Sequence, residues 1–277
     1  MRAVALRGRV VGILAILVTV VVFLVPFAFI FVTAAKTAPE ANQLAFSLPT
    51  EWALWDNVVA VLTTRDGIVL RAFINSTVIT VAAVTLKVLF AAMVGYVLQR
   101  RQSRWNAIIN FFVLAGLIIP PAVVPTIWIL QGLGLFKTIP GLILIEATFG
   151  LSFGILLVRA FVAGIPRELD EAAVIDGAGP IRLFFQVVLP LLRPVLITII
   201  VVQSVAVFNE FQNALYFLPG AQNATVQLTL YNFSSQELSQ YNLLFMDILL
   251  ITIPPLVMFI FFNRQIVAGM TSGAIKG

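Results

Sequence analysis

The sequence contains no cysteine and no histidine among its 277 residues. Without cysteine there can be no disulfide and no thiol nucleophile, and the usual zinc sites and histidine-based acid–base catalysis are excluded as well. Charged residues make up only 10% of the chain. No G-x-x-x-x-G-K-[ST] segment occurs, so a phosphate-binding loop for ATP is also lacking. We therefore expect no metal site, no catalytic residue and no enzymatic activity on this chain.

Apolar side chains, in contrast, are abundant. They form 61% of the sequence, and the mean hydropathy is +1.06, which is far too apolar for a soluble domain of this size. The formal net charge is +5, but the basic residues are scattered between apolar runs. Such scattering indicates membrane topology and not a nucleic-acid surface. The composition thus predicts an all-α integral membrane protein.

Six apolar runs are long enough to cross a bilayer. The first follows three arginines and is longer than the apolar core of a secretory signal peptide, so we expect it to remain uncleaved. Prolines in the third and sixth runs predict bends or breaks, because proline lacks the backbone N–H. The mixed segment 33–71 is expected to be extracytoplasmic, with short helical pieces. The expected spans are Val10–Val32, Ala72–Gln99, Trp105–Phe136, Ile139–Val158, Val187–Leu218 and Leu243–Phe262.

An even number of spans places both termini on one side of the membrane. Twelve basic residues would lie on that side against four on the other, so the positive-inside rule predicts cytoplasmic termini. We divide the chain into a first span with an extracytoplasmic segment (1–71), a core of five spans (72–264) and a cytoplasmic tail (265–277). The same orientation makes the polar loop 165–190 cytoplasmic.

This loop, IPRELDEAAVIDGAGPIRLFFQVVLP, predicts a short helix. Pro166 suits the first helical position, and the acidic residues that follow it favour the positive end of the helix dipole. Gly177 and Gly179, followed by Pro180, end the helix. The resulting rod is about 16 Å long, too short to span a bilayer. By periodicity alone it is an amphipathic interfacial helix, with one face made by Ile165, Leu169, Ala172 and Ala173.

The same loop resembles, at fixed spacing, the EAA loop of ABC importer permeases. The matching residues are Glu171, Ala172, Ala173, Gly177, Val187, Leu189 and Pro190, with valine at 187 where isoleucine is more usual. In that family the loop is a coupling helix that docks on a cytoplasmic ATPase. The resemblance implies the six-helix fold of these permeases and assigns ATPase coupling to Leu169, Glu171, Ala172, Ala173, Asp176, Gly177 and Pro190.

Similarity to the carbohydrate-uptake branch of the family extends from about residue 75 to the C-terminus. It is carried by short segments such as Asn75-Ser76, Gly95-Tyr96, Ile119-Pro120-Pro121 and the closing Thr271 to Gly277. The resemblance implies a bacterial inner-membrane subunit surrounded by lipid. Its implied partners are a second homologous permease, an ABC ATPase dimer that carries ATP and Mg, and an extracytoplasmic sugar-binding protein. No cofactor on this chain and no nucleic acid are implied.

Three further groups of residues follow from the same resemblance. Phe208, Asn209 and Glu210 resemble part of a W-N-D-F segment of sugar permeases, with phenylalanine for tryptophan and glutamate for aspartate, and they are candidates for the translocation path. A hydrogen bond that ties two helices together is the alternative for the polar pair. Aromatic residues on the loop before the last span are expected to contact the binding protein, unless they pack on the membrane surface. The tail is expected to reach the ATPase interface, unless it is a disordered end. The residues of these last two groups are Tyr231, Phe233 and Tyr241, and Ser272, Gly273 and Lys276.

Lys87 and Glu146 are two further charges inside apolar runs. Counting along the helices places them at depths of about 24 Å and 10 Å, so a direct ion pair requires strong tilting. We predict transport of a sugar, such as a di- or oligosaccharide, by alternating access. An ABC importer of a non-sugar solute and an ATP-independent carrier with broken helices remain as alternatives.

Overall fold

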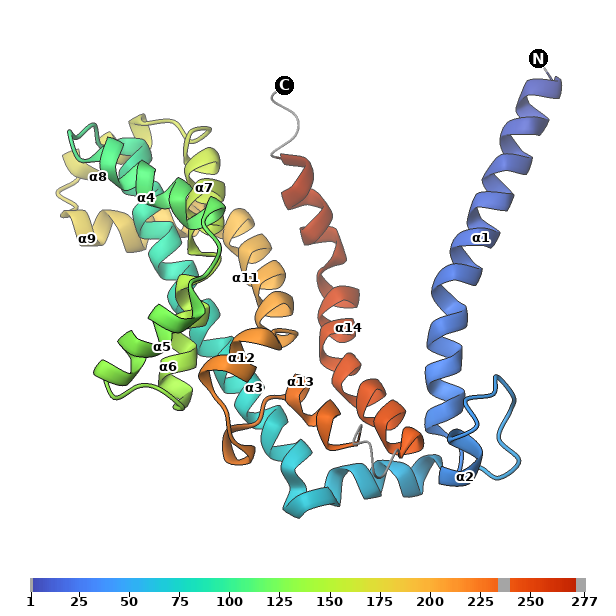
Figure 1. Cartoon of the computed structure of the whole chain (residues 1–277). Helices are drawn as coiled ribbons and strands as arrows, with labels where there is room; N and C mark the ends of the chain where they lie inside the picture. Colours follow the sequence, from blue (N-terminus) through green and yellow to red (C-terminus); the bar gives the residue numbers. More distant parts are fainter. Residues whose placement is uncertain (1, 234–239, 273–277) are drawn as a thin grey trace. The chain divides into compact units, whose positions relative to one another are not determined.

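The computed structural model describes residues 2–233 and 240–272, and the regular elements in these ranges are helical (Figure 1). The chain divides into two units, which are considered separately. The first comprises residues 1–70 and 229–253, and the second comprises residues 71–228 and 254–277. Two long helices, α3 (Leu54–Arg100) and α14 (Tyr241–Ser272), contribute residues to both units.

The described residues contain up to six candidate membrane spans, in the order that the sequence predicts. Three single helices are long and apolar enough to cross a bilayer, at Gly12–Ala34, Leu54–Arg100 and Tyr241–Asn263. Three more spans result if each strongly bent pair of helices counts as one. These pairs are α4 (Asn106–Ile118) with α5 (Val123–Gly132), α6 (Ile139–Thr148) with α7 (Leu151–Val162), and Pro180–Leu191 with α11 (Arg193–Phe208).

In the first unit, a buried lysine organises the segment that follows α1 (Arg2–Ala34). Lys36 is 1% exposed, and its Nζ donates to the carbonyl of Ala45 at 2.8 Å and to Ser47 Oγ at 3.0 Å. Asn57 Nδ2 donates to the carbonyls of Ala34 and Lys36. The predicted short helical pieces are α2 (Ala38–Ala41) and the first part of α3. Buried polar groups that are satisfied in this way hold the segment against the helix ends.

Helix α3 begins earlier than the expected second span, at Leu54 instead of Ala72. Its regular geometry is broken at Thr64–Gly67, where Arg65, Asp66 and Gly67 have positive φ angles of 47°, 56° and 73°. The sequence pattern did not reveal this extension, because the charges at 65 and 66 look like a loop. The stretch before the break carries Trp55, which is exposed.

Proline breaks the third span as predicted. Helix α4 ends at Ile118, and α5 begins at Val123 after a turn of 117°. Pro120 and Pro121 lie between them, and Ile119 has the extended ψ of 122° that a residue before proline prefers. The fourth span is also broken, with a bend of 43° between α6 and α7 at Phe149-Gly150.

Helices α3 and α7 approach each other closely in the second unit. Small residues allow this approach, since a Cβ added at Gly95 would lie 2.8 Å from the side chain of Val158, and one added at Gly154 would lie 3.0 Å from Ala91. Close backbone contact through small residues is the usual packing of membrane helices. A buried apolar cluster that includes Ile155, Val158 and Ile199 continues this contact into α11.

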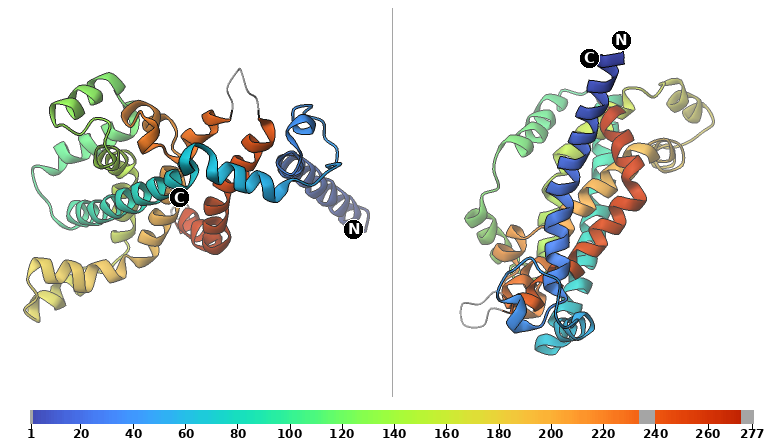
Figure 2. Two further views of the ribbon diagram at one scale, coloured as in Figure 1. Left: turned by 90° about the horizontal axis from the view of Figure 1, so that it is seen from below. Right: turned by 90° about the vertical axis from the view of Figure 1, so that its right-hand side faces the viewer.

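Within this unit, α8 (Glu168–Ile175) and α9 (Pro180–Arg182) lie at one end, and α5 and α6 lie toward the other (Figures 1 and 2). A π-helical turn at Leu183–Val188 and α10 (Leu189–Leu191) lead from α9 into α11. The expected fifth span 187–218 is therefore not one helix, because α12 (Gln212–Phe217) is separate from α11. Helix α8 begins two residues after Pro166, and α14 continues ten residues past the expected Phe262. The remaining short helices are η2 (Ala221–Asn223), α13 (Val226–Thr229) and η3 (Leu230–Asn232).

Candidate functional site

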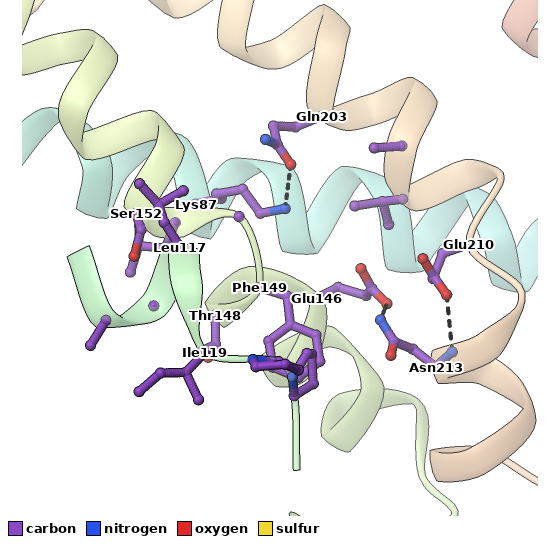
Figure 3. A pocket seen from close by; sticks show the side chains of 18 of the residues that line it. Lys87, Leu117, Ile119, Glu146, Thr148, Phe149, Ser152, Gln203, Glu210 and Asn213 are labelled. Carbon is purple, nitrogen blue, oxygen red and sulfur yellow. Dashed lines mark hydrogen bonds between the residues drawn. The ribbon is translucent and has the colours of Figure 1, made fainter. Parts of the chain in front are cut away.

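A cavity of about 810 Å³ lies in the second unit, beside the breaks in three of its spans (Figure 3). Its wall includes the break between α4 and α5, the break between α6 and α7, and the junction of α11 and α12. Most of the wall is apolar, as in other ligand cavities. Its charged and amide-bearing side chains are Lys87, Glu146, Gln203, Glu210, Gln212 and Asn213.

Lys87 enters this cavity from α3. Its side chain is 1% exposed, and Nζ donates to Gln203 Oε1 of α11 at 2.7 Å. Gly150 lies against this pair, since a Cβ there would be 2.9 Å from Gln203 Oε1 and 3.3 Å from Lys87 Nζ. Gly150 also has a φ of 81° and precedes the first residue of α7. The break in the fourth span thus leaves room for the lysine–glutamine pair.

Glu146 and Glu210 are held by the start of α12. Glu146 is 5% exposed, and its Oε1 accepts from Asn213 Nδ2 at 2.8 Å. Glu210 Oε1 accepts from the backbone N–H groups of Gln212 and Asn213 at 2.8 and 3.0 Å, which otherwise lack partners at a helix N-terminus. Lys87 and Glu146 therefore line one cavity but bind amides instead of each other. The direct ion pair considered from the sequence is not formed.

The structure separates the residues expected on the translocation path. Glu210 lines the cavity, whereas Phe208 is buried at 6% exposure and packs within the fold. Asn209 is exposed, donates to the carbonyl of Val205 within α11 and accepts from Gln227 Nε2 of α13 at 3.1 Å. Gln203 and Asn213 were missed by the sequence motifs. Their only signal was an amide inside an apolar run.

The loop expected to couple to an ATPase contains α8 at its centre. Val174, Ile175 and Ile181 are exposed apolar side chains there, with Ile175 85% exposed. Among the residues that the resemblance assigned to docking, the exposed ones are Leu169, Glu171, Ala172, Asp176, Gly177 and Pro190. Ala173 differs, because it packs against the core of the second unit. The exposed face of α8 therefore includes fewer residues than the helix periodicity predicted.

The end of α8 is a glycine turn of the predicted kind. Gly177 has a φ of 82°, and the N–H of Ala178 donates to the carbonyl of Ala173 at 2.9 Å. This bond spans six residues, as in the Schellman motif that ends many helices. Gly177 is therefore required by the backbone conformation, which other residues adopt at a cost.

An arginine at the end of α3 contacts the start of this loop. Arg100 Nε lies 2.7 Å from Asp170 Oδ2, and the two side chains are 12% and 16% exposed. Arg100 Nη2 also donates to the carbonyls of Ile165 at 3.0 Å and Pro166 at 3.4 Å. Neither residue belonged to the set predicted from the sequence, because a pair 70 positions apart leaves no local pattern.

The remaining expected contacts fall at the edges of the described structure. In the first unit Tyr231 is exposed, but Phe233 is 2% exposed and its ring is not presented to a partner. Tyr241 is half-buried at the start of α14. Ser272 is the last residue of α14, while Gly273 and Lys276 lie outside the described residues. Within the ranges that the structure describes, no cluster of three acidic residues suited to a metal ion is present.

Comparison with known proteins gives consistent matches. Residues 87–272 match the family described as binding-protein-dependent transport system inner membrane component. The diacetylchitobiose uptake system permease protein of Streptomyces coelicolor is 33% identical over 265 residues, covering 92% of this chain and 85% of that protein. The trehalose transport system permease protein of Mycobacterium tuberculosis is 32% identical, covering 92% and 93%. The melibiose/raffinose/stachyose import permease protein of Bacillus subtilis is 31% identical, covering 75% and 76%.

The fold is also that of a solved transporter. A crystal structure of a bacterial ABC transporter involved in the import of the acidic polysaccharide alginate superposes with a TM-score of 0.84. The match covers 95% of this chain and 98% of that one at 20% sequence identity. A second structure, of a bacterial alginate ABC transporter in complex with an alginate pentasaccharide-bound periplasmic protein, gives a TM-score of 0.67 at 14% identity, with 92% of each chain covered. At these identities the likeness establishes the fold alone.

Proposed function

This chain belongs to the family of binding-protein-dependent transport system inner membrane components, and from that premise we propose that it is the permease subunit of an ATP-driven sugar importer. It is a membrane component and not an enzyme, and it lies in the bacterial inner membrane. The family match over residues 87–272 is the observation that carries this conclusion. The sugar cargo is supported by the relatives, which are named for the uptake of diacetylchitobiose, trehalose and melibiose.

The polar cavity is where this subunit would contact the passing sugar. A sugar presents hydroxyl groups that both donate and accept hydrogen bonds, and the cavity offers a buried ammonium, two carboxylates and several amides. Its volume of about 810 Å³ falls within the range of small-molecule sites. Charged residues inside a membrane protein are costly and usually face a water-filled path. Glu210 remains a candidate for the translocation path. The cavity adds Lys87, Glu146, Gln203 and Asn213 to these candidates. Phe208 and Asn209 would instead support the cavity wall.

Transport would proceed by alternating access. A separate ATPase dimer, which binds ATP and Mg, would close on the exposed face of α8 and move it. A second permease would complete the path, and an extracytoplasmic binding protein would deliver the sugar. The cytoplasmic position of both termini and of α8 follows from the positive-inside rule. Tyr231 and Tyr241 remain candidates for contact with the binding protein, and the tail from Ser272 remains a candidate for the ATPase interface.

The two alternatives are weakened to different degrees. Members of this family work together with a binding protein, whereas an ATP-independent carrier needs none. Family membership therefore argues against the carrier. An importer of a phosphorylated solute would call for several cations in the cavity. The described part of the wall carries one lysine and two glutamates, which suits an uncharged, hydroxyl-rich cargo better.

Co-purification tests this function directly. The tagged chain would be extracted from its native membrane in a mild detergent, and the proteins recovered with it would be identified by mass spectrometry. We expect an ATPase, a second permease and a binding protein. The binding protein would then be titrated with diacetylchitobiose, melibiose, raffinose and trehalose to define the sugar class. Recovery of this chain alone, from a preparation that keeps other ABC complexes intact, would contradict the proposal.

A further inference from the structure

One side chain of α3, Arg100, contacts three residues of the loop 165–190: two before α8 and one in its first turn. Arg100 forms its ion pair with Asp170 in the first turn of α8, and it donates to the carbonyls of Ile165 and Pro166 before the helix. Both partners of the ion pair are largely buried, at 12% and 16% exposure. The hydrogen bonds from Nη2 to the carbonyls are charge-assisted and so stronger than neutral ones, and burial limits the screening of the ion pair by salt. This contact is therefore unlike an exposed surface ion pair, which contributes little.

A second residue of α3 contacts the segment that follows α8. The Tyr96 ring lies 5.9 Å from the ring of Phe184 in the π-helical turn. Phe184 is buried, so the turn that follows α8 is anchored to the same stretch of α3. The end of α3 thus contacts the loop both before and after the coupling helix.

Arginine is suited to this position for a geometric reason. Its planar guanidinium is rigid, so one side chain can pair its charge with the Asp170 carboxylate beside Nε while Nη2 donates to the backbone carbonyls. A lysine has a single nitrogen at the end of a flexible chain and cannot reproduce both contacts. A neutral residue would leave the largely buried Asp170 without its cation, which is unfavourable.

We propose that Arg100 is a positioning residue that fixes α8 to α3, so that the coupling helix and the end of this span move as one body. Helix α3 also carries Lys87 into the polar cavity, about 20 Å from Arg100 along the helix. Motion of α8 would therefore reach the cavity wall through α3, in addition to the chain connections through α7 and α11. This inference rests on the proposed function, because it assumes an ATPase that moves α8.

A distance measurement tests the proposal without knowledge of the sugar. The chain has no cysteine, so Val97→Cys on α3 and Glu168→Cys at the start of α8 place two spin labels without background from this subunit. In the whole complex, we expect a narrow distance distribution that is the same without nucleotide and with ATP bound. Arg100→Met should broaden this distribution or shift it by several ångströms between the two states. The neighbouring Arg101→Met is the matched control, because Arg101 is exposed, and it should leave the distribution unchanged.

Coupling provides a second readout. Uptake of radiolabelled trehalose, or of whichever of the four titrated sugars the binding protein retains, is compared with ATP hydrolysis in proteoliposomes that contain the whole complex. We expect Arg100→Met, Arg100→Lys and Asp170→Asn to lower uptake per ATP hydrolysed at least fivefold, with the ATPase still bound. The exchange Arg100→Asp with Asp170→Arg should recover part of this loss, since it restores opposite charges.

Two results obtained with the intact complex would overturn the proposal. One is an unchanged spin-label distribution in Arg100→Met in both nucleotide states, and the other is normal uptake per ATP in that variant. Failure of the proposed function looks different, because the complex would then contain no ATPase at the co-purification step. Loss of the complex in Arg100→Met but not in Asp170→Asn would assign Arg100 to assembly and would also reject a positioning role.

Discussion

At the scale of single residues, the polar groups of the cavity work in pairs. Lys87 binds Gln203, and Glu146 binds Asn213, so each of these two buried charges is matched by a side-chain amide. An amide satisfies one hydrogen bond of a charged group without neutralising it. Among the described residues, Lys87 Nζ therefore keeps donors that are not used by Gln203 and that can bind a hydroxyl group. This arrangement predicts that the pairs affect cargo binding more than insertion into the membrane.

The Lys87–Gln203 pair predicts non-additive mutations. Either Lys87→Met or Gln203→Leu leaves a buried polar partner unsatisfied, at a cost of about 1–3 kcal/mol. If this cost falls on cargo binding, KM for uptake should rise about 5- to 150-fold. The double variant should cost less than the sum of the two, because neither partner then remains unpaired. KM for uptake by intact cells, at matched amounts of protein in the membrane, measures the effect. Strict additivity would show that the two side chains act independently.

Gly150 predicts a stability effect with a matched control. Gly150→Ala combines a left-handed backbone with a Cβ only 2.9 Å from Gln203 Oε1, and the backbone contribution alone is about 1–2 kcal/mol. We expect a lower midpoint of thermal unfolding in detergent and reduced uptake. Gly132→Ala is the control, since a Cβ at this helical position would have no heavy atom within 4 Å. Equal midpoints for the two variants would contradict the close contact at Gly150.

At the scale of secondary-structure elements, broken helices create the site. Regular spanning helices satisfy their backbone groups internally, and irregular backbone inside a membrane occurs where it lines a protein interior or a cavity. Here α4–α5, α6–α7 and α11–α12 are each interrupted, and residues beside all three interruptions line the cavity. The breaks place Glu146, Gly150 and Glu210 around one space. Three straight helices would not bring these groups together in the same way.

The glycine turn after α8 gives the prediction at this scale. Gly177→Ala introduces a Cβ into open space but forces alanine into a left-handed conformation, at a cost of about 1–2 kcal/mol. The exit of α8 should change direction, and transport should fall roughly fivefold. Gly179→Ala is the control, because Gly179 has a φ of −69° and equally open surroundings. Similar uptake in both variants would show that the turn geometry does not matter for coupling.

At the scale of the whole molecule, the chain provides a candidate translocation path but no site for ATP hydrolysis. Its sequence lacks a phosphate-binding loop, and its exposed apolar residues on α8 are suited to contact with another protein. Exposed apolar side chains also cover much of α1 and α14, where lipid or a second permease would meet them. Transport is therefore expected only in an assembly with other chains.

The source of energy is a testable consequence. In intact cells that express the full system, depletion of ATP with arsenate should abolish uptake of the labelled sugar. A protonophore should lower the initial rate little while the ATP concentration is maintained, because no ion gradient drives the step. Both rates are measured against a strain that lacks this chain. Uptake that survives arsenate but stops with the protonophore would instead indicate a secondary carrier.

The sequence by itself determined the class, the order of the candidate spans and the short loop helix. These features depend on local properties, namely long apolar runs, proline breaks and a glycine that ends a helix, so they can be read without knowledge of distant contacts. The break in the third span at Pro120-Pro121 is an example. The break before Gly150 was not expected, because one glycine in an apolar run does not specify a helix end.

Only the tertiary structure decided which side chains meet. Lys87 and Gln203 are 116 positions apart, and Glu146 and Asn213 are 67 apart, so no sequence spacing links them. The same holds for Arg100 and Asp170. Burial of Phe208 and Phe233 and the inward packing of Ala173 were likewise set by neighbouring helices. Helix periodicity fixes which residues share a face, but the packing of several helices decides whether that face meets the core, the cavity or a partner.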